Sequence, residues 1–204
     1  MTIKSKLKLI SIILTLTVSY LPTPAGAQDA PTAISQSPNP VSTNNYSENI
    51  LSDALHALIL DDSITLQIVP QPVGNINFVT PLPNYVTGYQ TAINYGTIGL
   101  LAHNYLAGRY FFQILLEQEI KLIYGDNSIE TFTVTQIKKY QALSPNSPSS
   151  DFTDLTTGEY LTANQLFRKM YANQFGHIVL QTCINADQNP TWGRLFIVAE
   201  PLTH

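Results

Sequence analysis

Short apolar stretches alternate with polar turns through most of the chain, and several have the length or the alternation of β-strands. The stretches that predict strands are 64–69, 96–103, 119–124, 129–140, 177–183 and 194–199. Gly125-Asp126-Asn127 stands between two of them, and such a polar, glycine-containing turn is typical of a β-hairpin. The pattern therefore predicts a mostly antiparallel sheet that closes into a barrel or a sandwich.

A few segments have the spacing of helices instead. Residues 47–59 and 110–118 repeat apolar positions every three or four residues, and a third such run begins at Thr162. Two segments without such spacing, 142–157 and 185–193, are predicted to be loops. We interpret the longer one either as a cover over a cleft or as a solvated excursion, and its length favours the cover.

The N-terminus has the order of a secretory signal. Lys4, Lys6 and Lys8 precede the apolar run 9–21, and small residues at Ala25 and Ala27 follow it, so residues 1–27 are predicted to be a signal peptide. An uncleaved anchor is the alternative, although thirteen apolar residues are fewer than the ~20 that span a bilayer as a helix. Residues 28–46 are rich in Pro, Ser and Asn and read as a linker, which leaves 47–204 as one folded domain.

Charge narrows the class of partner. Only 12 % of the residues are charged, and without the leader seven basic residues face fourteen acidic ones, a net charge of −7. An acidic chain without a basic stripe gains little from releasing the counterions of a phosphate backbone, so nucleic acid is excluded as the expected partner.

Cysteine usage is unusual for an exported protein. Cys183 is the one cysteine of the chain, so no disulfide forms within it. Extracellular cysteines normally pair, and a single thiol is therefore either a buried, inert side chain or a functional one.

Three residues of reactive type stand where predicted strands end or begin. His103 closes the run GTIGLLAH, Cys183 closes HIVLQTC, and Arg194 opens RLFIVA. A thiolate is a nucleophile, an imidazole protonates a leaving amine, and a guanidinium stabilises an oxyanion. Since a thiol that reacts at neutral pH needs a cationic neighbour, His103 and Arg194 are the expected partners of Cys183.

These motifs resemble the sortases, cysteine transpeptidases that attach proteins to bacterial cell walls or assemble pili. The resemblance rests on LLAHNYLAG around His103, VLQTC ending at Cys183 and WGRLFIVA around Arg194, in that order, and covers about residues 64–199. It implies a closed β-barrel of about seven or eight strands with a few short helices. Cys183 would be the nucleophile, His103 the general acid and base, and Arg194 the group that holds the substrate and the oxyanion.

The same resemblance implies the partners. They are a sorting-motif peptide of a secreted protein and an amine acceptor or water, with membrane or cell-wall association; no cofactor is implied, and a requirement for calcium stays open. Val179 stands where the family has its first Thr, Ala102 replaces the usual Gly before the His, and Gln118-Glu119 replaces a Gly-Asp. These departures remove no reactive group, but they prevent the family's substrate class from being carried over to this chain. The alternative is a secreted sortase-like domain that binds peptides without catalysis.

Other enzymes and other residues fit less well. The L,D-transpeptidases have a Ser-His-Gly-Cys signature that is absent before Cys183, and papain-like proteases place Cys before His in the chain. No metal is expected, because no C-x-x-C or H-x-x-x-H spacing is present. His56, His177, His204 and Arg109 are read as structural or solvated. Several tyrosines near His103 are predicted to line a peptide groove or to pack at its rim: Tyr85, Tyr89, Tyr95, Tyr105 and Tyr110.

Overall fold

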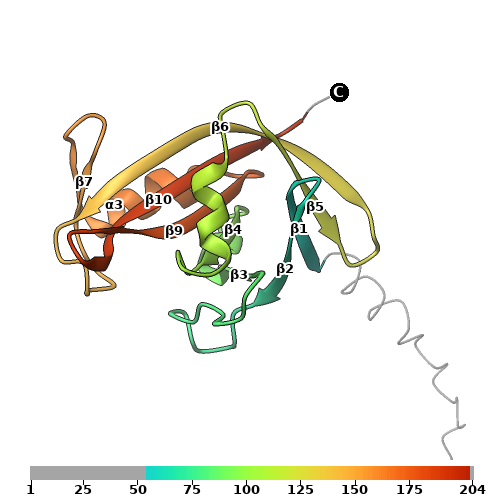
Figure 1. Cartoon of the computed structure of the whole chain (residues 1–204), viewed down its shortest axis with the longest axis horizontal. Helices are drawn as coiled ribbons and strands as arrows, with labels where there is room; N and C mark the ends of the chain where they lie inside the picture. Colours follow the sequence, from blue (N-terminus) through green and yellow to red (C-terminus); the bar gives the residue numbers. More distant parts are fainter. Residues whose placement is uncertain (1–53, 203–204) are drawn as a thin grey trace, which may run out of the picture. The chain divides into compact units, whose positions relative to one another are not determined.

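The computed structural model describes residues 54–202, which form a domain built mainly of β-strands (Figure 1). The elements, in chain order, are β1 (Leu55–Asp61), β2 (Ile64–Pro70), β3 (Tyr85–Gly88), α2 (Gln90–Ile93), β4 (Ile98–Ala102), the 3₁₀ helix η1 (Ala107–Gln113), β5 (Glu119–Tyr124), β6 (Ile129–Ala142), β7 (Phe152–Asp154), β8 (Tyr160–Leu161), α3 (Ala163–Phe167), the π-helical turn η2 (Arg168–Ala172), β9 (Ile178–Ala186) and β10 (Asn189–Pro201).

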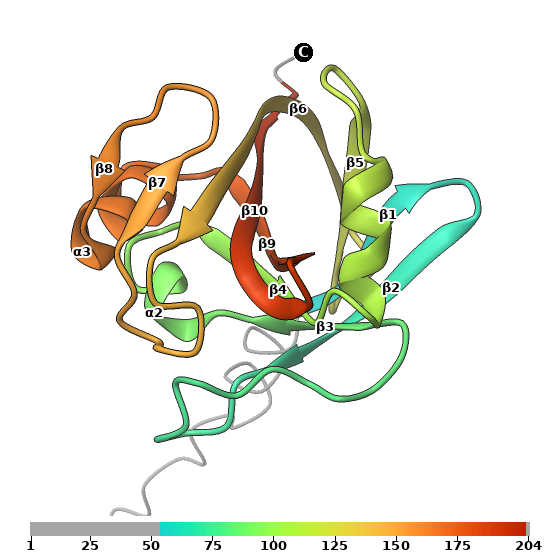
Figure 2. The same ribbon diagram turned by 60° about the vertical axis from the view of Figure 1, so that its left-hand side comes forward.

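Eight of the strands close into a barrel. The hydrogen-bonded order runs β10-β9-β4-β3-β2-β1-β5-β6, and β6 pairs back with β10, so the ring has no free edge (Figure 2). Most neighbouring pairs are antiparallel, while β2–β3 and β4–β9 are parallel. The predicted fold class, a mostly β closed barrel of about seven or eight strands with a few short helices, is confirmed.

Alternate residues of the strands β9 and β10 lie on opposite faces of the barrel wall. In β9, Ile178 and Leu180 belong to the interior cluster, whereas Val179 belongs to a second apolar cluster on the outer face. In β10, Leu195, Ile197 and Ala199 point inward. Because successive side chains of a strand point to opposite faces, the odd residues of β9 and the even residues of β10 lie on the outside.

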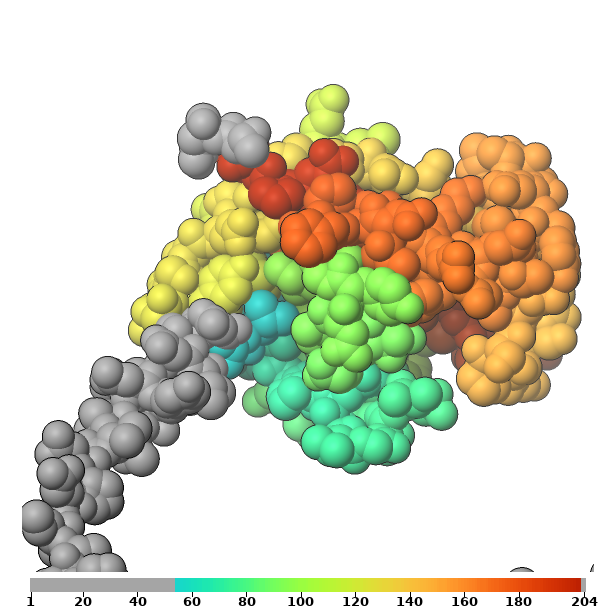
Figure 3. Space-filling view, turned by 180° about the vertical axis from the view of Figure 1, so that it is seen from behind, coloured from blue at the N-terminus to red at the C-terminus, as the bar shows by residue number. Residues whose placement is uncertain are grey.

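A helical segment covers part of that outer face. Thr162 caps α3 with a capping box, in which its hydroxyl oxygen accepts from the Gln165 backbone and the Gln165 side chain accepts from the Thr162 backbone. From there α3 and η2 bring Leu166, Met170 and Tyr171 onto the outer cluster. Figure 3 shows this orange segment beside the green segment that contains α2, which agrees with the edge-on contacts of Phe167 with Tyr89 and Tyr95.

The inside of the barrel is plugged at one end by η1. Ala107 and Phe111 of this helix are fully buried in the interior cluster. Gly108 lies so close to β9 that a Cβ on it would overlap Thr182 and the carbonyl oxygen of His103. The end of the barrel at which β4 finishes is therefore filled.

The predicted strands are confirmed, but the predicted helix over 47–59 is wrong where the structure describes it. Residues 55–59 belong to β1, which pairs with β2 and β5 on its two sides. Leu58 and Leu60 face the core, so the apolar positions serve a strand held between two neighbours. Helical spacing in a short apolar run does not distinguish the two structures, and the tertiary pairing decides.

The predicted loop over 185–193 is also wrong, because β9 and β10 extend through it. They meet at Asp187 and Gln188, which both have positive φ values of 51° and 60°, as a tight two-residue hairpin turn requires. Cys183 and Arg194 therefore lie within a hairpin. Their strands do not end or begin there.

Two further segments differ in part from expectation. The helix expected over 110–118 is a 3₁₀ helix that ends at Gln113. The loop expected over 142–157 contains β7, which pairs with the end of β6, and its Phe152 and Asp154 are buried. The predicted signal peptide, 1–27, and linker, 28–46, lie outside the described residues. Within 54–202, no helix is long and apolar enough to span a bilayer.

Candidate active site

Two of the residues singled out in the sequence lie on neighbouring strands, and the third directly follows the next strand. Arg194 of β10 pairs directly with Cys183 of β9. Beside them, β4 runs parallel to β9 with Ala102 opposite Thr182, and His103 follows Ala102 as Cys183 follows Thr182. The barrel thus aligns His103, Cys183 and Arg194 side by side in one row, which we call the reactive row, although 91 positions separate the first from the last.

Two contacts hold the His103 ring, and the next residue fastens the turn that carries it. Its Nε2 lies 3.3 Å from the carbonyl oxygen of Val79, and its ring stacks on Tyr105 with 5.3 Å between centroids. The next residue, Asn104, donates from Nδ2 to the carbonyl oxygen of Pro190 in the β9–β10 hairpin, at 3.0 Å. The turn after β4 is therefore fastened to the hairpin that carries Cys183 and Arg194.

Cys183 is a free thiol of intermediate exposure on the outer face. Its neighbour Thr182 is buried and donates from its hydroxyl to the carbonyl oxygen of Ala102, at 2.8 Å, which locks β9 to β4 one residue before the reactive row. Within 54–202, no hydrogen bond joins Cys183 to His103 or Arg194. The thiol is supported by a rigid strand and remains accessible.

Arg194 is anchored through one nitrogen of its guanidinium group. Nη1 donates to the carbonyl oxygens of Thr191 and Gly193, both at 2.9 Å, and the group lies 5.9 Å from the Phe152 ring centroid. Among the described residues, Nε and Nη2 have no hydrogen-bond partner. A guanidinium held in this way keeps donors for a ligand oxygen.

The remaining candidates fall elsewhere. His177 bonds through Nδ1 to Gln174, at 2.8 Å, and Arg109 bonds to and stacks on Tyr110 at the surface. Of the clustered tyrosines, Tyr105 reaches the reactive row, while Tyr89 and Tyr95 pack against Phe167. Over residues 54–202, no group of three or more His, Cys, Asp or Glu side chains is placed to hold a metal ion.

Two supports of the row were not foreseen in the sequence. The Val79 carbonyl lies in a loop whose anchor is a hydrogen bond from the Thr80 backbone to the Thr87 hydroxyl, at 2.8 Å. Phe152 comes from a segment read as a loop. A backbone carbonyl has no sequence signal, but the single aromatic residue among the polar residues of 144–154 was a usable one for Phe152.

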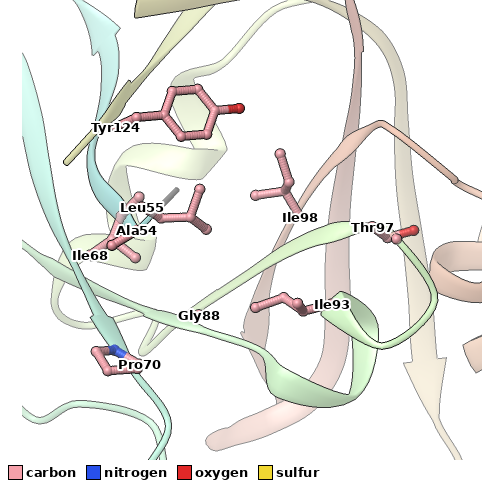
Figure 4. Close-up of a pocket in the computed structure, with 10 residues that line it drawn as sticks. Ala54, Leu55, Ile68, Pro70, Gly88, Ile93, Thr97, Ile98 and Tyr124 are labelled. Carbon is pink, nitrogen blue, oxygen red and sulfur yellow. The ribbon is translucent and has the colours of Figure 1, made fainter. Parts of the chain in front are cut away.

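A separate apolar cavity of about 470 Å³ lies at the opposite end of the barrel (Figure 4). The side chains of Leu55, Ile68, Ile98 and Tyr124 surround it, and Gly88 forms part of its wall. Because β4 begins at this cavity with Ile98 and ends before His103, the reactive row and the cavity mark the two ends of one strand.

No family model and no curated protein matches the chain. Solved structures that are similar to it include several sortases. Sortase A of Listeria monocytogenes is 16 % identical over 74 % of this chain and 89 % of its own, with a TM-score of 0.44. Sortase C of Clostridium perfringens with the C-terminal cell wall sorting motif is 17 % identical over 75 % and 72 %, with a TM-score of 0.42.

Sortase C1 of Streptococcus agalactiae gives similar values, with 12 % identity over 73 % of this chain and 67 % of its own and a TM-score of 0.44. Likenesses this distant carry no argument about activity. The chemistry of this chain is therefore inferred from the closed strand ring and the reactive row.

Proposed function

We propose that this protein is an exported cysteine transpeptidase of the sortase type, which cleaves a sorting-type peptide through an acyl intermediate on Cys183. The observation that carries the proposal is the reactive row, in which one barrel wall aligns a thiol, an imidazole and a guanidinium. Each of the three is the group that acyl transfer needs, as nucleophile, proton donor and oxyanion holder. Export rests on the predicted leader, 1–27.

In the first half-reaction, the proton of the Cys183 thiol is on the His103 imidazole, and the resulting thiolate attacks a backbone carbonyl carbon of the peptide. A C–S bond forms and a tetrahedral oxyanion develops, which then collapses as the C–N bond breaks. His103 gives its proton to the leaving nitrogen, so the amine departs neutral and a thioester remains on Cys183. The imidazole is suited to this because Val79 and Tyr105 restrict its orientation.

Arg194 acts on the oxygen of the attacked carbonyl. Its Nη1 is bound to the hairpin backbone, so its remaining donors approach the substrate from a fixed direction. Donors held in place before the reaction stabilise a developing oxyanion without reorganising.

In the second half-reaction, an amine of the acceptor gives a proton to the neutral His103 and attacks the thioester carbonyl. The new C–N bond forms, the C–S bond breaks, and the Cys183 thiolate returns. Water in place of the amine gives hydrolysis by the same steps, so transpeptidation and hydrolysis are two outcomes of one acyl intermediate.

The test is mass spectrometry of the purified protein mixed with a library of sorting-type pentapeptides. We expect an acyl adduct on Cys183 in the wild type, none in Cys183→Ala, and a strongly reduced amount in His103→Gln. His56→Gln is the matched control, since His56 is an exposed histidine on β1. An adduct that persists in Cys183→Ala contradicts the proposal.

A peptide-binding domain without catalysis is the competing function, and thiol alkylation separates the two. Rapid alkylation of Cys183 by iodoacetamide that slows in His103→Gln supports the enzyme. Alkylation at the same rate in both proteins, with peptide binding but no adduct, supports the binding domain.

A further inference from the structure

Gln181 lies where the covered part of the outer face ends and the open part begins. It is two residues before Cys183 on β9, so both side chains are on the same face. On one side of it, Val179 and Tyr171 are buried in the outer cluster. On the other side comes the reactive row. A peptide lying over β9 toward Cys183 therefore passes Gln181.

The buried Tyr171 holds one end of the Gln181 side chain. Its hydroxyl donates to Oε1 of Gln181 at 2.6 Å. The phenol ring is fixed by edge contacts with Tyr89 and Phe196, at 5.2 and 5.9 Å between centroids. Burial raises the pKa of Tyr171 well above its usual value, so the hydroxyl keeps its proton and remains a donor.

This contact decides which way the amide points. The Tyr171 hydroxyl makes no other hydrogen bond within 54–202, so its proton needs the Gln181 oxygen as acceptor. The NH₂ group at the other end of the amide has no partner among the described residues, and Gln181 is half-buried. Two N–H donors are thus presented at the outer face, about 6.6 Å along the strand from Cys183.

We propose that Gln181 is a substrate-binding residue whose amide NH₂ donates a hydrogen bond to an acceptor oxygen of the bound peptide, about two residues from the bond that is cleaved. Tyr171 is its positioning residue. The proposal rests on the proposed function for the existence of a peptide substrate. It adds that the enzyme selects peptides with an acceptor, a carbonyl or a side-chain oxygen, at that position.

The test compares Gln181→Met, which keeps the length of the side chain and removes both donors, with Gln136→Met. Gln136 is a half-buried glutamine in the β6 ladder, opposite Val198 of β10 and away from the reactive row. For the pentapeptide that binds best, we expect Gln181→Met to raise KM about tenfold with kcat within twofold, the loss of one hydrogen bond. Tyr171→Phe should raise KM by a smaller factor, and Gln136→Met should leave it unchanged.

A binding measurement keeps the result independent of catalysis. In the Cys183→Ala background, the Kd of the same peptide should rise with Gln181→Met as KM does, and the NMR signal of the Gln181 NH₂ group should shift when wild-type protein meets the peptide. Equal Kd values for the two methionine variants, or an unmoved NH₂ signal, overturn the proposal.

The two proposals fail in different ways. If a peptide binds with the expected dependence on Gln181 but never acylates Cys183, the proposed transpeptidase activity is overturned and the binding role of Gln181 is supported. If acylation occurs with an unchanged KM in Gln181→Met, the binding role of Gln181 is overturned and the proposed transpeptidase activity is supported. If no peptide of the library binds, both are overturned.

Discussion

The two ends of the barrel are built in opposite ways although β4 connects them. At the end where β4 finishes, η1 fills the interior with Ala107 and Phe111, and the reactive row lies over this support. At the end where β4 begins, Ile98 borders an apolar cavity of about 470 Å³. One end is packed and carries polar, reactive side chains, and the other is hollow and lined almost entirely by apolar groups.

The difference shows where this fold needs rigidity. Groups that cooperate on one carbonyl must be held within a fraction of an ångström, and dense packing with buried hydrogen bonds achieves this. At the packed end, Thr182 bonds to Ala102 and Asn104 bonds to Pro190, which ties β4 to β9 and to the hairpin. Among residues 54–202, no comparable set of reactive groups lines the hollow end, and a cavity is present there. Substitutions at the two ends should therefore have different effects.

The largest expected effect comes from the reactive row itself. Arg194→Lys keeps the positive charge but removes the planar set of donors, so we expect kcat/KM for acyl formation to fall about a hundredfold. The midpoint of thermal unfolding should change little, because the side chain is half-exposed. Arg168→Lys, a change at an arginine bonded to Asn164, is the control and should keep full activity. Equal activities of the two variants would contradict the role of Arg194.

Gly108→Ala should disrupt the packing of η1 against β9 at the packed end. The new Cβ would lie 2.7 Å from the His103 carbonyl oxygen and 2.9 Å from Thr182 Cβ, so η1 must shift away. We expect the free energy of unfolding to fall by about 1–3 kcal/mol, measured by urea denaturation. The rate of acyl formation should fall as well, because the carbonyl belongs to His103. A stable variant with full activity would show that this end is not tightly packed.

The same substitution at the hollow end should be harmless. In Gly88→Ala, the nearest atoms to the new Cβ are at 3.8–3.9 Å, which is ordinary contact. Alanine has fewer backbone conformations than glycine in the unfolded chain, so folding loses less entropy. We therefore expect the free energy of unfolding to rise by about 0.5 kcal/mol, with the rate of acyl formation unchanged. Denaturation of the two alanine variants side by side compares the ends directly. A loss of stability in Gly88→Ala equal to that in Gly108→Ala would erase the difference.

The smallest expected effect is on acid stability, and here the two ends should behave alike. Hydrogen bonds from Ser63 lower the pKa of Asp61 at the packed end, and bonds from Ser128 lower the pKa of Asp126 at the hollow end. A carboxyl whose pKa is lower in the folded state than its ordinary value of 3.8 stabilises the fold at pH values above 3.8. This contribution disappears as the pH falls through the pKa of the folded state.

Thermal unfolding between pH 2 and pH 6 measures this contribution. In Asp61→Asn and in Asp126→Asn, the midpoint of thermal unfolding should depend slightly less on pH in the range below about pH 4. The two effects should be similar in size, because both carboxyls are exposed. A much steeper effect at one turn would reveal a further charge interaction at that end.

The success of sequence-based prediction varied with the kind of element. The alternation in 64–69 and 119–124 correctly predicted β2 and β5, because each strand has one apolar face. The helical spacing that begins at Thr162 correctly predicted the start of α3. The helix expected over 47–59 was wrong for 55–59, where pairing on both sides decided the structure. The hairpin turn at Asp187 and Gln188 was missed because it contains no glycine.

The sequence supplied the candidate site residues as a prediction, but it did not supply the geometry around them. The sequence indicated His103, Cys183 and Arg194 by type and by strand context. The partners of these residues, the Val79 carbonyl beside His103 and Phe152 of β7 beside Arg194, come from distant segments and carry no motif. The orientation of Gln181 depends on Tyr171, ten residues earlier in the chain and on a different element.

By itself, the sequence determined a mostly β domain, an acidic composition and the presence of one cysteine, a histidine and an arginine of matching chemistry, because these follow from local pattern and residue type. Only the tertiary structure decided that β4, β9 and β10 are neighbours and in which register. Register depends on interior packing along the whole barrel, and a slip of one residue would turn Cys183 to the opposite face. The tertiary structure also decided that one end of the barrel is filled and the other hollow, since that depends on where η1 folds back.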